Sequence, residues 1–294
     1  MKDGKRSDSV LGVDIKIIQA IELDILLEFD RICKKHSLNY QLYSGTLIGA
    51  IRHKGFIPWD DDVDVCMLRE DYDKFLSLAE AELGDNYFLQ THETDPNYIN
   101  KYGKIRRNGT FFMEKLVVGE EMHHGMYIDI FAFDNIEPHT EEGMEQIKQL
   151  QNIDSFFKYR LKARFETLEE GPERDEAKRK YDIIKNSPVK KLTVENWALG
   201  IMTRFNHKKT QWVGDLANPS SAVLDNFMMK RSQIEDSIDW EFEGHKLPVP
   251  RDYHEILTRA YGDYMTPPDK LDRVSHHNIM EIRIDEDVLK DIGK

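Results

Sequence analysis

Apolar residues recur every three or four positions between residues 14 and 35, which is the period of a helix with one buried face. The apolar positions are Ile18, Ile21, Ile25, Phe29 and Ile32, and the polar positions between them include Glu22, Glu28, Arg31 and Lys35. The pattern therefore predicts an amphipathic helix over 14–35, with Glu22 among its polar residues.

Short segments of strand and helix character follow. NYQLYSG (39–45) has the composition of a strand, TLIGAIRHKG (46–55) that of a short helix ending at a glycine, and the apolar residues of 72–83 have helical spacing. Three more segments, 98–107, 109–118 and 125–133, read as strands separated by glycines or short polar links. Together these segments predict an α+β fold, in which helices flank a mixed sheet.

The second half of the chain changes character. Residues 141–209 form long, highly charged helical patterns, and they are followed by a predicted hairpin over 240–250 and a helix over 251–262. We expect three parts: a core at 1–140, a mainly helical lobe at 141–210, and a C-terminal part at 211–294 that completes the active-site cleft.

Composition narrows the function. The 294 residues carry a formal charge of −13, from 54 acidic and 41 basic side chains, which disfavours nucleic acid as a partner. No apolar run reaches the length of a membrane span, and the N-terminus does not resemble a signal peptide, so we expect a cytoplasmic protein. Cys33 and Cys66 are the only cysteines, and neither has metal-binding spacing.

The segment IPWDDDVDV (57–65) carries the densest negative charge. If it is a strand, its side chains alternate, so that Asp60, Asp62 and Asp64 share one face while Asp61 faces the core with Val63 and later apolar residues. Three carboxylates on one face repel one another unless a cation neutralises them, and Mg²⁺ (or Mn²⁺) prefers such oxygen ligands. The alternative is a solvated acidic strand.

Two other segments favour a phosphate-handling metal site. Gly45 and Thr46 stand where a strand passes into a helix N-terminus, a place suited to a phosphate group. In YIDIFAF, Asp129 interrupts an apolar strand, and a neighbouring metal ion would explain a carboxylate at such a position. The alternative for Asp129 is a loop cap or a pair with an arginine.

Positive side chains near these segments are candidate phosphate ligands. Arg52, His53 and Lys54 lie between the glycine turn and the acidic segment, and Lys104 and Arg106 share one face of GKIRR; for each of them, pairing with an aspartate is an equal alternative. His276 and His277 are candidates for contact with the substrate rather than for metal binding.

The residues of these motifs, taken in order, indicate a particular protein family. YSGTLIGAIRHKGFIPWDDDVDVCMLREDYDKF (43–75), KYGKIRRNGTFF (101–112), YIDIFAFD (127–134), LPVPRDYHEILTRAYGDYMTPP (247–268) and SHH (275–277) strongly resemble the LicD family of phosphotransferases. That family includes bacterial phosphocholine transferases, is related to fukutin and fukutin-related protein, and belongs to the nucleotidyltransferase superfamily. The resemblance implies a nucleotidyltransferase-like core.

Carried over by residue, the resemblance implies that Asp62, Asp64 and Asp129 hold the catalytic metal ions, with Asp60 as a further ligand, and that Gly45 and Thr46 cradle the donor phosphate. It also favours a contact of His276 and His277 with the site. The implied reaction moves a phospho-alcohol, typically phosphocholine, from a CDP-activated donor such as CDP-choline to a hydroxyl of a cell-surface glycan or teichoic acid precursor. CMP would leave, and Asp129 is our candidate for the group that accepts the hydroxyl proton.

Two alternatives are kept. The same metal site would serve a nucleotidyltransferase that transfers NMP from an NTP, and a non-catalytic homologue would only bind metal or nucleotide, although the presence of all three carboxylates argues against the latter. The DVD motif also occurs in glycosyltransferases, but these place it after several β/α units, and too little chain precedes it here. For the segment FFKYRLKARF (156–165), we favour packing on the core over contact with a membrane that carries a lipid-linked acceptor.

Overall fold

The computed structural model describes residues 9–219, 226–275 and 277–293. Its helices are α1 (Ile15–His36), α2 (Ser44–His53), α3 (Arg69–Glu82), α4 (Glu141–Arg160), α5 (Ala163–Glu166), α6 (Pro172–Lys185), α7 (Lys191–Met202), α9 (Arg231–Glu235), α10 (Tyr253–Tyr261) and α11 (Glu286–Asp291), with short 3₁₀ turns at Lys115–Val117 and Lys270–Asp272. Among the described helices, none combines the length and apolar character needed to cross a bilayer.

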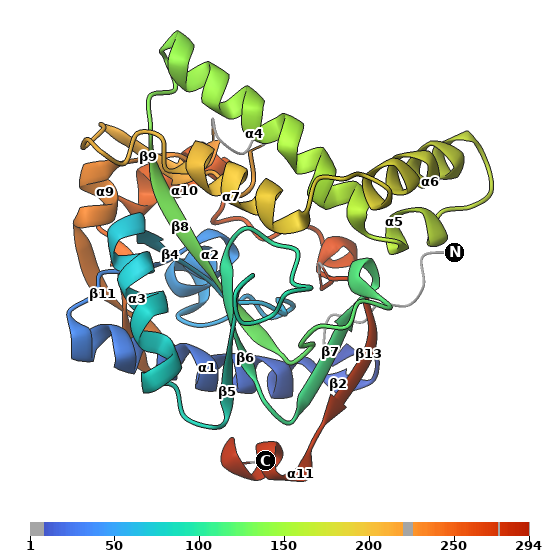
Figure 1. Ribbon diagram of the computed structural model, residues 1–294. Coiled ribbons are helices and arrows are strands. Elements are labelled where there is room, and N and C mark those ends of the chain that lie inside the picture. The colour runs from blue at the N-terminus through green and yellow to red at the C-terminus, as the bar shows by residue number, and fades with distance from the viewer. Residues whose placement is uncertain (1–8, 220–225, 276, 294) are drawn as a thin grey trace.

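The strands of the main sheet are β3 (Gln41–Leu42), β4 (Asp64–Leu68), β5 (Tyr87–Gln90), β6 (Gly103–Arg107), β8 (Tyr127–Ile136), β9 (Trp212–Asp215) and β10 (Met229–Lys230). β8 is the central strand: β4 pairs with it in parallel on one side, and β6 and β9 pair with it antiparallel. Figure 1 shows this long strand running through the centre of the molecule. The predicted α+β fold with a mixed sheet is confirmed.

Three two-stranded sheets complete the fold: β1 (Ser9–Val10) with β2 (Val13–Asp14), β11 (Ser237–Phe242) with β12 (His245–Pro250), and β7 (Thr110–Glu114) with β13 (Ile279–Ile284). The predicted hairpin over 240–250 is confirmed as β11–β12. The expectation that 109–118 joins the main sheet is wrong, because β7 pairs instead with β13, from the C-terminal end of the chain.

The two faces of the main sheet have different surroundings. One face packs on α1 and α3, where Val65 and Ile130 contact a large apolar core that includes Phe29 and Phe75. The other face carries Phe131 and a second, smaller core. Since side chains alternate along a strand, Asp64 and Asp129 belong to this second face, with Cys66 and Phe131 next to them. Both cysteines are buried thiols.

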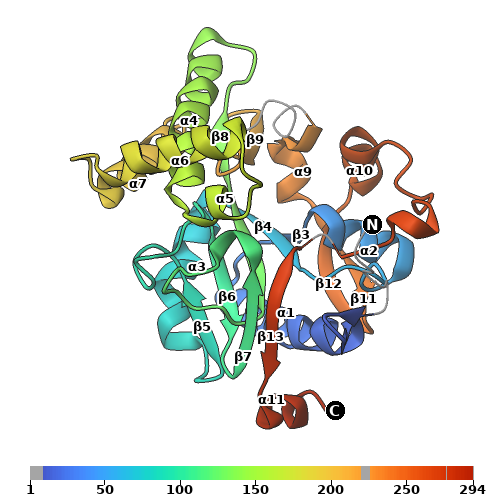
Figure 2. The same ribbon diagram turned by 90° about the vertical axis from the view of Figure 1, so that its right-hand side faces the viewer.

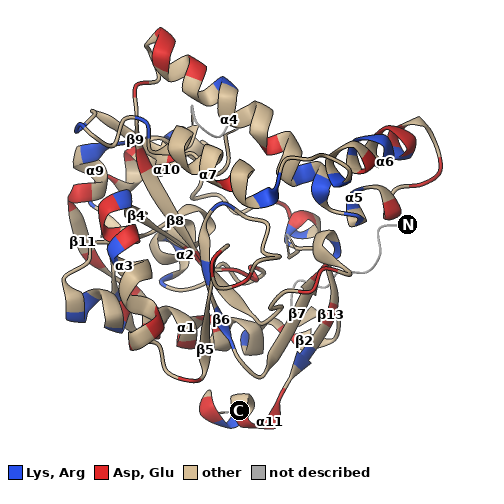
Figure 3. Ribbon diagram, viewed as in Figure 1, with Lys and Arg blue, Asp and Glu red and all other residues tan. Residues whose placement is uncertain are grey.

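Helices α4, α5, α6 and α7 lie between β8 and β9 in the chain, as the charged helical pattern predicts. They stand at the upper edge of the sheet in Figure 1, and Figure 2 shows them on the opposite side of the molecule from α9 and α10. Both acidic and basic residues occur along α6, as the red and blue segments of its ribbon show (Figure 3). Phe157, Leu161 and Phe165 are buried, so this segment packs inside the protein rather than offering an apolar face to a membrane. The division into three parts stays a prediction.

Candidate active site

Three charged residues form a row across the sheet. Asp64 on β4 is in register with Asp129 on β8, and Asp129 is opposite Lys104 on β6. Side chains in register on neighbouring strands point to the same face, so the three groups converge. The Lys104 Nζ lies 2.5 Å from the Asp129 Oδ1, and both side chains are buried. The structure thus brings together two carboxylates of the predicted metal site that lie on separate strands, Asp64 and Asp129.

The acidic segment before β4 is a loop, not a strand. The expectation of a strand from residue 60 is wrong, because β4 begins only at Asp64. A turn ends the preceding segment, with the Asp60 amide donating to the Ile57 carbonyl at 2.9 Å. The side-chain amide of Gln19 donates to the carbonyls of Ile57 and Asp60, at 3.1 and 2.9 Å, and so fastens the loop to α1.

Helix α2 supports this loop from the other side. The Thr46 hydroxyl is buried and accepts a hydrogen bond of 2.8 Å from the Asp64 amide. A Cβ atom on Gly45 would lie 3.1 Å from the Asp60 Oδ2, so the glycine lets that carboxylate approach the first turn of the helix. Thr46 therefore has a supporting role that the sequence did not reveal, and its contact with phosphate stays a prediction.

Crowding of the carboxylates disfavours their charged forms. Burial, followed by the charges of Asp62 and Asp61, raises the pKa of Asp60 well above its usual range. Burial and the charges of Asp62 and Asp129 do the same to Asp64. The pKa of Asp129 is raised by burial, although Lys104 opposes the shift. The charge of Asp62 contributes to all three shifts, which places this residue within the group.

Glu22 is a further carboxylate that the sequence analysis missed. It was expected on the polar side of its helix, yet only 2% of it is exposed and its Oε2 has no hydrogen-bond partner among the described residues. Burial, together with the charges of Asp61 and Asp62, raises its pKa well above the usual value. The available signal was its place one turn after Gln19, beside the apolar stripe of α1, where both polar residues are buried.

The carboxylates fit a divalent cation better than any protein cation that the structure describes beside them. The nearby positive groups already have partners, since Lys104 pairs with Asp129 and His277 with Asp61. A buried carboxylate such as Glu22 is costly without a counter-charge. Carboxylate oxygens are also the ligands that Mg²⁺ and Mn²⁺ prefer. Asp60, Asp62, Asp64 and Asp129 are therefore residues that could hold such an ion.

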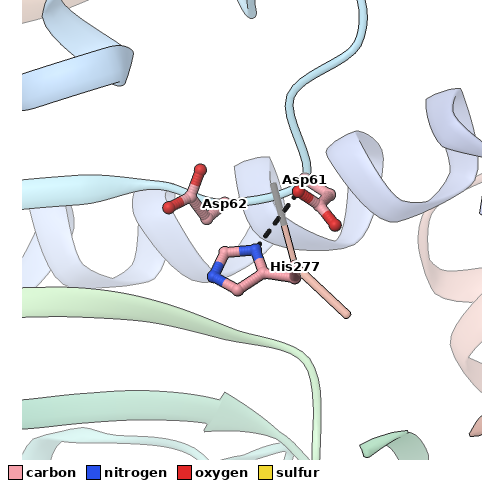
Figure 4. A group of neighbouring side chains, drawn as sticks. All are labelled: Asp61, Asp62 and His277. Carbon is pink, nitrogen blue, oxygen red and sulfur yellow. Dashed lines mark hydrogen bonds and ion pairs between the residues drawn. The ribbon is translucent and has the colours of Figure 1, made fainter. Parts of the chain in front are cut away.

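The C-terminal segment contributes His277, as the resemblance implies. Its Nδ1 lies 3.2 Å from the Asp61 Oδ1, and the Ser275 hydroxyl donates to the Asp61 Oδ2. Ligand atoms of Asp61, Asp62 and His277 lie within 4.8 Å of one another, and Figure 4 shows the imidazole pointing toward both carboxylates. Burial lowers the pKa of His277, but the bond to Asp61 and the charges of Asp62 and Asp61 outweigh it and raise the pKa to about 10.

Two expectations about this region need comment. Asp61 was predicted to face the apolar core, but it is buried among polar partners, because the loop breaks the strand alternation on which the prediction depended. The other residue, His276, lies outside the described residues, so its predicted contact with substrate stays a prediction.

Two of the candidate phosphate ligands, Arg106 and Lys54, are paired with other parts of the protein. Arg106 is 2% exposed and donates to Gln90 and to the Gly125 carbonyl, so its described contacts lie within the protein. The ammonium group of Lys54 pairs with Glu241 at 3.0 Å on the protein surface, and the backbone amide of Lys54 caps the end of α2. Neither arrangement favours the predicted contact with substrate.

Arg52 and His53 remain near the acidic loop. Arg52 donates to His53 and to the Tyr264 carbonyl, at 2.8 and 2.6 Å, and the charge of Asp60 acts on its pKa. Arg273, which the sequence analysis did not single out, lies over the Trp59 ring at 5.2 Å from the ring centre. Burial, followed by the charge of Arg273, lowers the pKa of Arg52, and burial, followed by the charges of Arg52 and Arg273, lowers the pKa of His53, so these basic groups lie together beside the acidic loop.

Comparisons with known proteins agree with this geometry. Residues 37–168 match the family described as LicD/FKTN/FKRP, nucleotidyltransferase domain. A lipopolysaccharide cholinephosphotransferase, LicD, of Haemophilus influenzae is 30% identical over 266 residues, which are 88% of this chain and 94% of that protein. The chain belongs to the LicD family.

Shorter matches concern two uncharacterized proteins, from Rickettsia prowazekii and Rickettsia typhi. Each is 40% identical over 47 residues, which are 16% of this LicD-family chain and 18% and 15% of the respective relatives. The long match, rather than these short ones, carries the family assignment, because it includes nearly the whole of both chains.

Proposed function

We propose that this LicD-family protein is a metal-dependent phosphotransferase that moves phosphocholine from CDP-choline to a hydroxyl of a cell-surface glycan precursor and releases CMP. The observation that carries the proposal is the pairing in register of Asp64 and Asp129, on both of which the charge of Asp62 acts, in a protein of this family. The name of the Haemophilus relative, a lipopolysaccharide cholinephosphotransferase, supports the phospho-alcohol and the glycan acceptor. A lipid-linked acceptor would bring the enzyme to the cytoplasmic face of a membrane.

The residues divide the work of an in-line displacement. Asp60, Asp62, Asp64 and Asp129 would hold Mg²⁺ or Mn²⁺, which when bound lowers the cost of the negative charge on the entering and departing oxygens. The first turn of α2 would offer backbone amides to the donor diphosphate, and Arg52 and Arg273, which lie near the acidic loop, would add positive charge.

Proton transfer involves Asp129 in this proposal. The new bond joins the acceptor oxygen to the phosphorus of phosphocholine, the bond from that phosphorus to the CMP oxygen breaks, and the hydroxyl proton passes to the Asp129 carboxylate. Lys104 holds the Oδ1 of Asp129 at 2.5 Å, which fixes the orientation of the carboxylate and opposes the rise of its pKa.

A donor panel tests the reaction. The purified protein is incubated with Mg²⁺, a glycan acceptor and either CDP-choline or one of the four NTPs, and the release of CMP or of pyrophosphate is measured. We expect CMP from CDP-choline, with a loss of at least about a thousandfold in Asp62→Asn and Asp129→Asn, because each variant removes a charge from the metal site. Pyrophosphate released from an NTP, without turnover of CDP-choline, would instead establish the nucleotidyltransferase alternative.

A further inference from the structure

A cavity of about 920 Å³ lies between the sheet and the helical region. On one side it is lined by α3 and by the loop that joins β5 to β6, and on the other by α7. Its volume lies within the range of cavities that bind small ligands. The acidic residues of the candidate active site are not among its lining residues, so this cavity is a separate feature.

The α7 wall exposes apolar side chains to the cavity. Leu192 and Leu199 line the cavity and are 63% and 45% exposed. Covering a leucine side chain is favourable, so a ligand that contacts both would gain binding free energy. The two leucines are seven positions apart and so lie on one side of the helix. Tyr72 and Leu76 on α3 also line the cavity. An apolar surface within a cavity of this size indicates a ligand with apolar faces.

The polar part of the lining carries balanced charge. The basic side chains are Arg69, Lys101, Lys190 and Lys191, and the acidic ones are Asp73, Glu80, Glu93 and Glu195. Several are already paired, since Glu195 lies 2.9 Å from the His92 Nδ1 and 3.0 Å from the Lys191 Nζ. Balanced, partly paired charges do not select an anion or a cation. They offer hydrogen-bonding groups to an uncharged ligand that carries many hydroxyls.

One aromatic residue separates the cavity from the acidic row. Tyr102 lines the cavity, and its ring centre lies 5.6 Å from the Lys104 Nζ, which in turn contacts Asp129. At the other end of the row, Thr46 of α2 binds the Asp64 amide. An in-line displacement needs the acceptor and the leaving group on opposite sides of the phosphorus, which would put the acceptor at the Tyr102 end of the row and the leaving group at the α2 end.

We propose that this cavity binds the acceptor as an uncharged oligosaccharide, with the apolar faces of its sugar rings against Leu192, Leu199 and Tyr72 and its hydroxyls toward the polar side chains. The sugar that receives phosphocholine then reaches past Tyr102 toward Asp129. The proposal depends on the proposed function for the identity of the reaction, but the binding of an oligosaccharide in the cavity can be measured without any turnover.

The test uses the full-length protein and a synthetic hexose oligosaccharide that carries neither charged groups nor acyl chains. Calorimetry measures its binding to the wild type and to Leu199→Trp, which fills the cavity, and Asn196→Ala, which removes a lining amide. Ile183→Trp is the matched control, because Ile183 is 57% exposed on α6 and does not line the cavity. We expect affinity to fall at least about tenfold in Leu199→Trp, to fall in Asn196→Ala, and to stay unchanged in Ile183→Trp.

The circular dichroism spectrum and the urea unfolding midpoint of Leu199→Trp should match those of the wild type, which shows that the variant is folded. Equal affinity in Leu199→Trp and the wild type overturns the proposal, as does the absence of binding to the wild type at millimolar oligosaccharide or binding of acylated lipopolysaccharide alone. If CDP-choline is not turned over but the oligosaccharide still binds in the cavity, the proposed reaction fails and the binding site stands.

Discussion

Replacing Glu22 by glutamine tests whether the ionised form of this buried side chain destabilises the folded protein beside the candidate metal site. The substitution keeps the shape of the side chain and removes its charge. Because the folded protein holds the pKa of Glu22 above the unfolded value of 4.5, ionisation opposes folding, and the native state loses stability as pH rises from 4.5 toward the folded pKa. The variant escapes this loss.

The size of the effect follows from the pH interval. Each pH unit over which the unfolded state is ionised and the folded state is not is worth about 1.4 kcal/mol, so the metal-free variant should be more stable than the wild type at pH 7. Near pH 4 the two proteins should have equal stability. Mg²⁺ should stabilise the variant less than the wild type, since one carboxylate fewer faces the added charge.

The assay is urea unfolding at pH 4, 5.5 and 7, in EDTA and in Mg²⁺. Asp30→Asn is the matched control, because Asp30 is buried on the same helix but accepts bonds from Tyr40 and Lys34, at 2.9 and 2.7 Å. The control should lose about 1–3 kcal/mol, and its response to Mg²⁺ should match that of the wild type. If Glu22→Gln lowers stability equally at all three pH values, Glu22 is a satisfied structural group and the reasoning is wrong.

Two further substitutions probe the loop. Gly45→Ala should leave the protein folded but lower transfer activity at least about tenfold, because the new Cβ would lie 3.1 Å from the Asp60 Oδ2 and displace that carboxylate; unchanged steady-state rates would contradict this. His277→Gln should destabilise the metal-free protein most below pH 6.5, where the imidazolium bond to Asp61 is fully present. Because the folded pKa is about 10, this deficit should shrink as pH rises from 6.5 through 10, and a deficit in urea unfolding that does not change with pH would refute it.

The sequence revealed the fold class and the paired aspartates because both depend on local patterns. A strand with apolar residues at alternate positions has only one register that keeps Asp129 out of the apolar core, and the same holds for Asp64 on β4. Once these two strands pair in parallel, the carboxylates must be neighbours. Lys104 could be linked to them for the same reason, since it lies on the third strand of the row.

Other features depend on contacts that a local pattern does not contain. Alternation failed over Asp60 and Asp61 because Gln19 and a turn hold that segment as a loop, and these contacts join parts of the chain about 40 residues apart. The partner of β7 comes from the C-terminal end, beyond the reach of any short-range signal. Arg106 and Lys104 share a strand face, yet only the local surroundings show that Arg106 is engaged by Gln90 and Lys104 by Asp129.

Repulsion among the carboxylates of the candidate site affects the stability of the folded protein. Asp60, Asp64 and Glu22 all have raised pKa values for the same reason, which is burial next to other carboxylates, and removing any one charge relaxes the others. A folded protein that buries several carboxylates without enough neighbouring cations has a lower free energy of unfolding than it would have without them. That loss is recovered only when a cation enters. A metal-binding role therefore predicts that divalent ions and raised pH act in opposite directions on the stability of the wild type, whereas a purely structural acidic cluster would respond to pH alone.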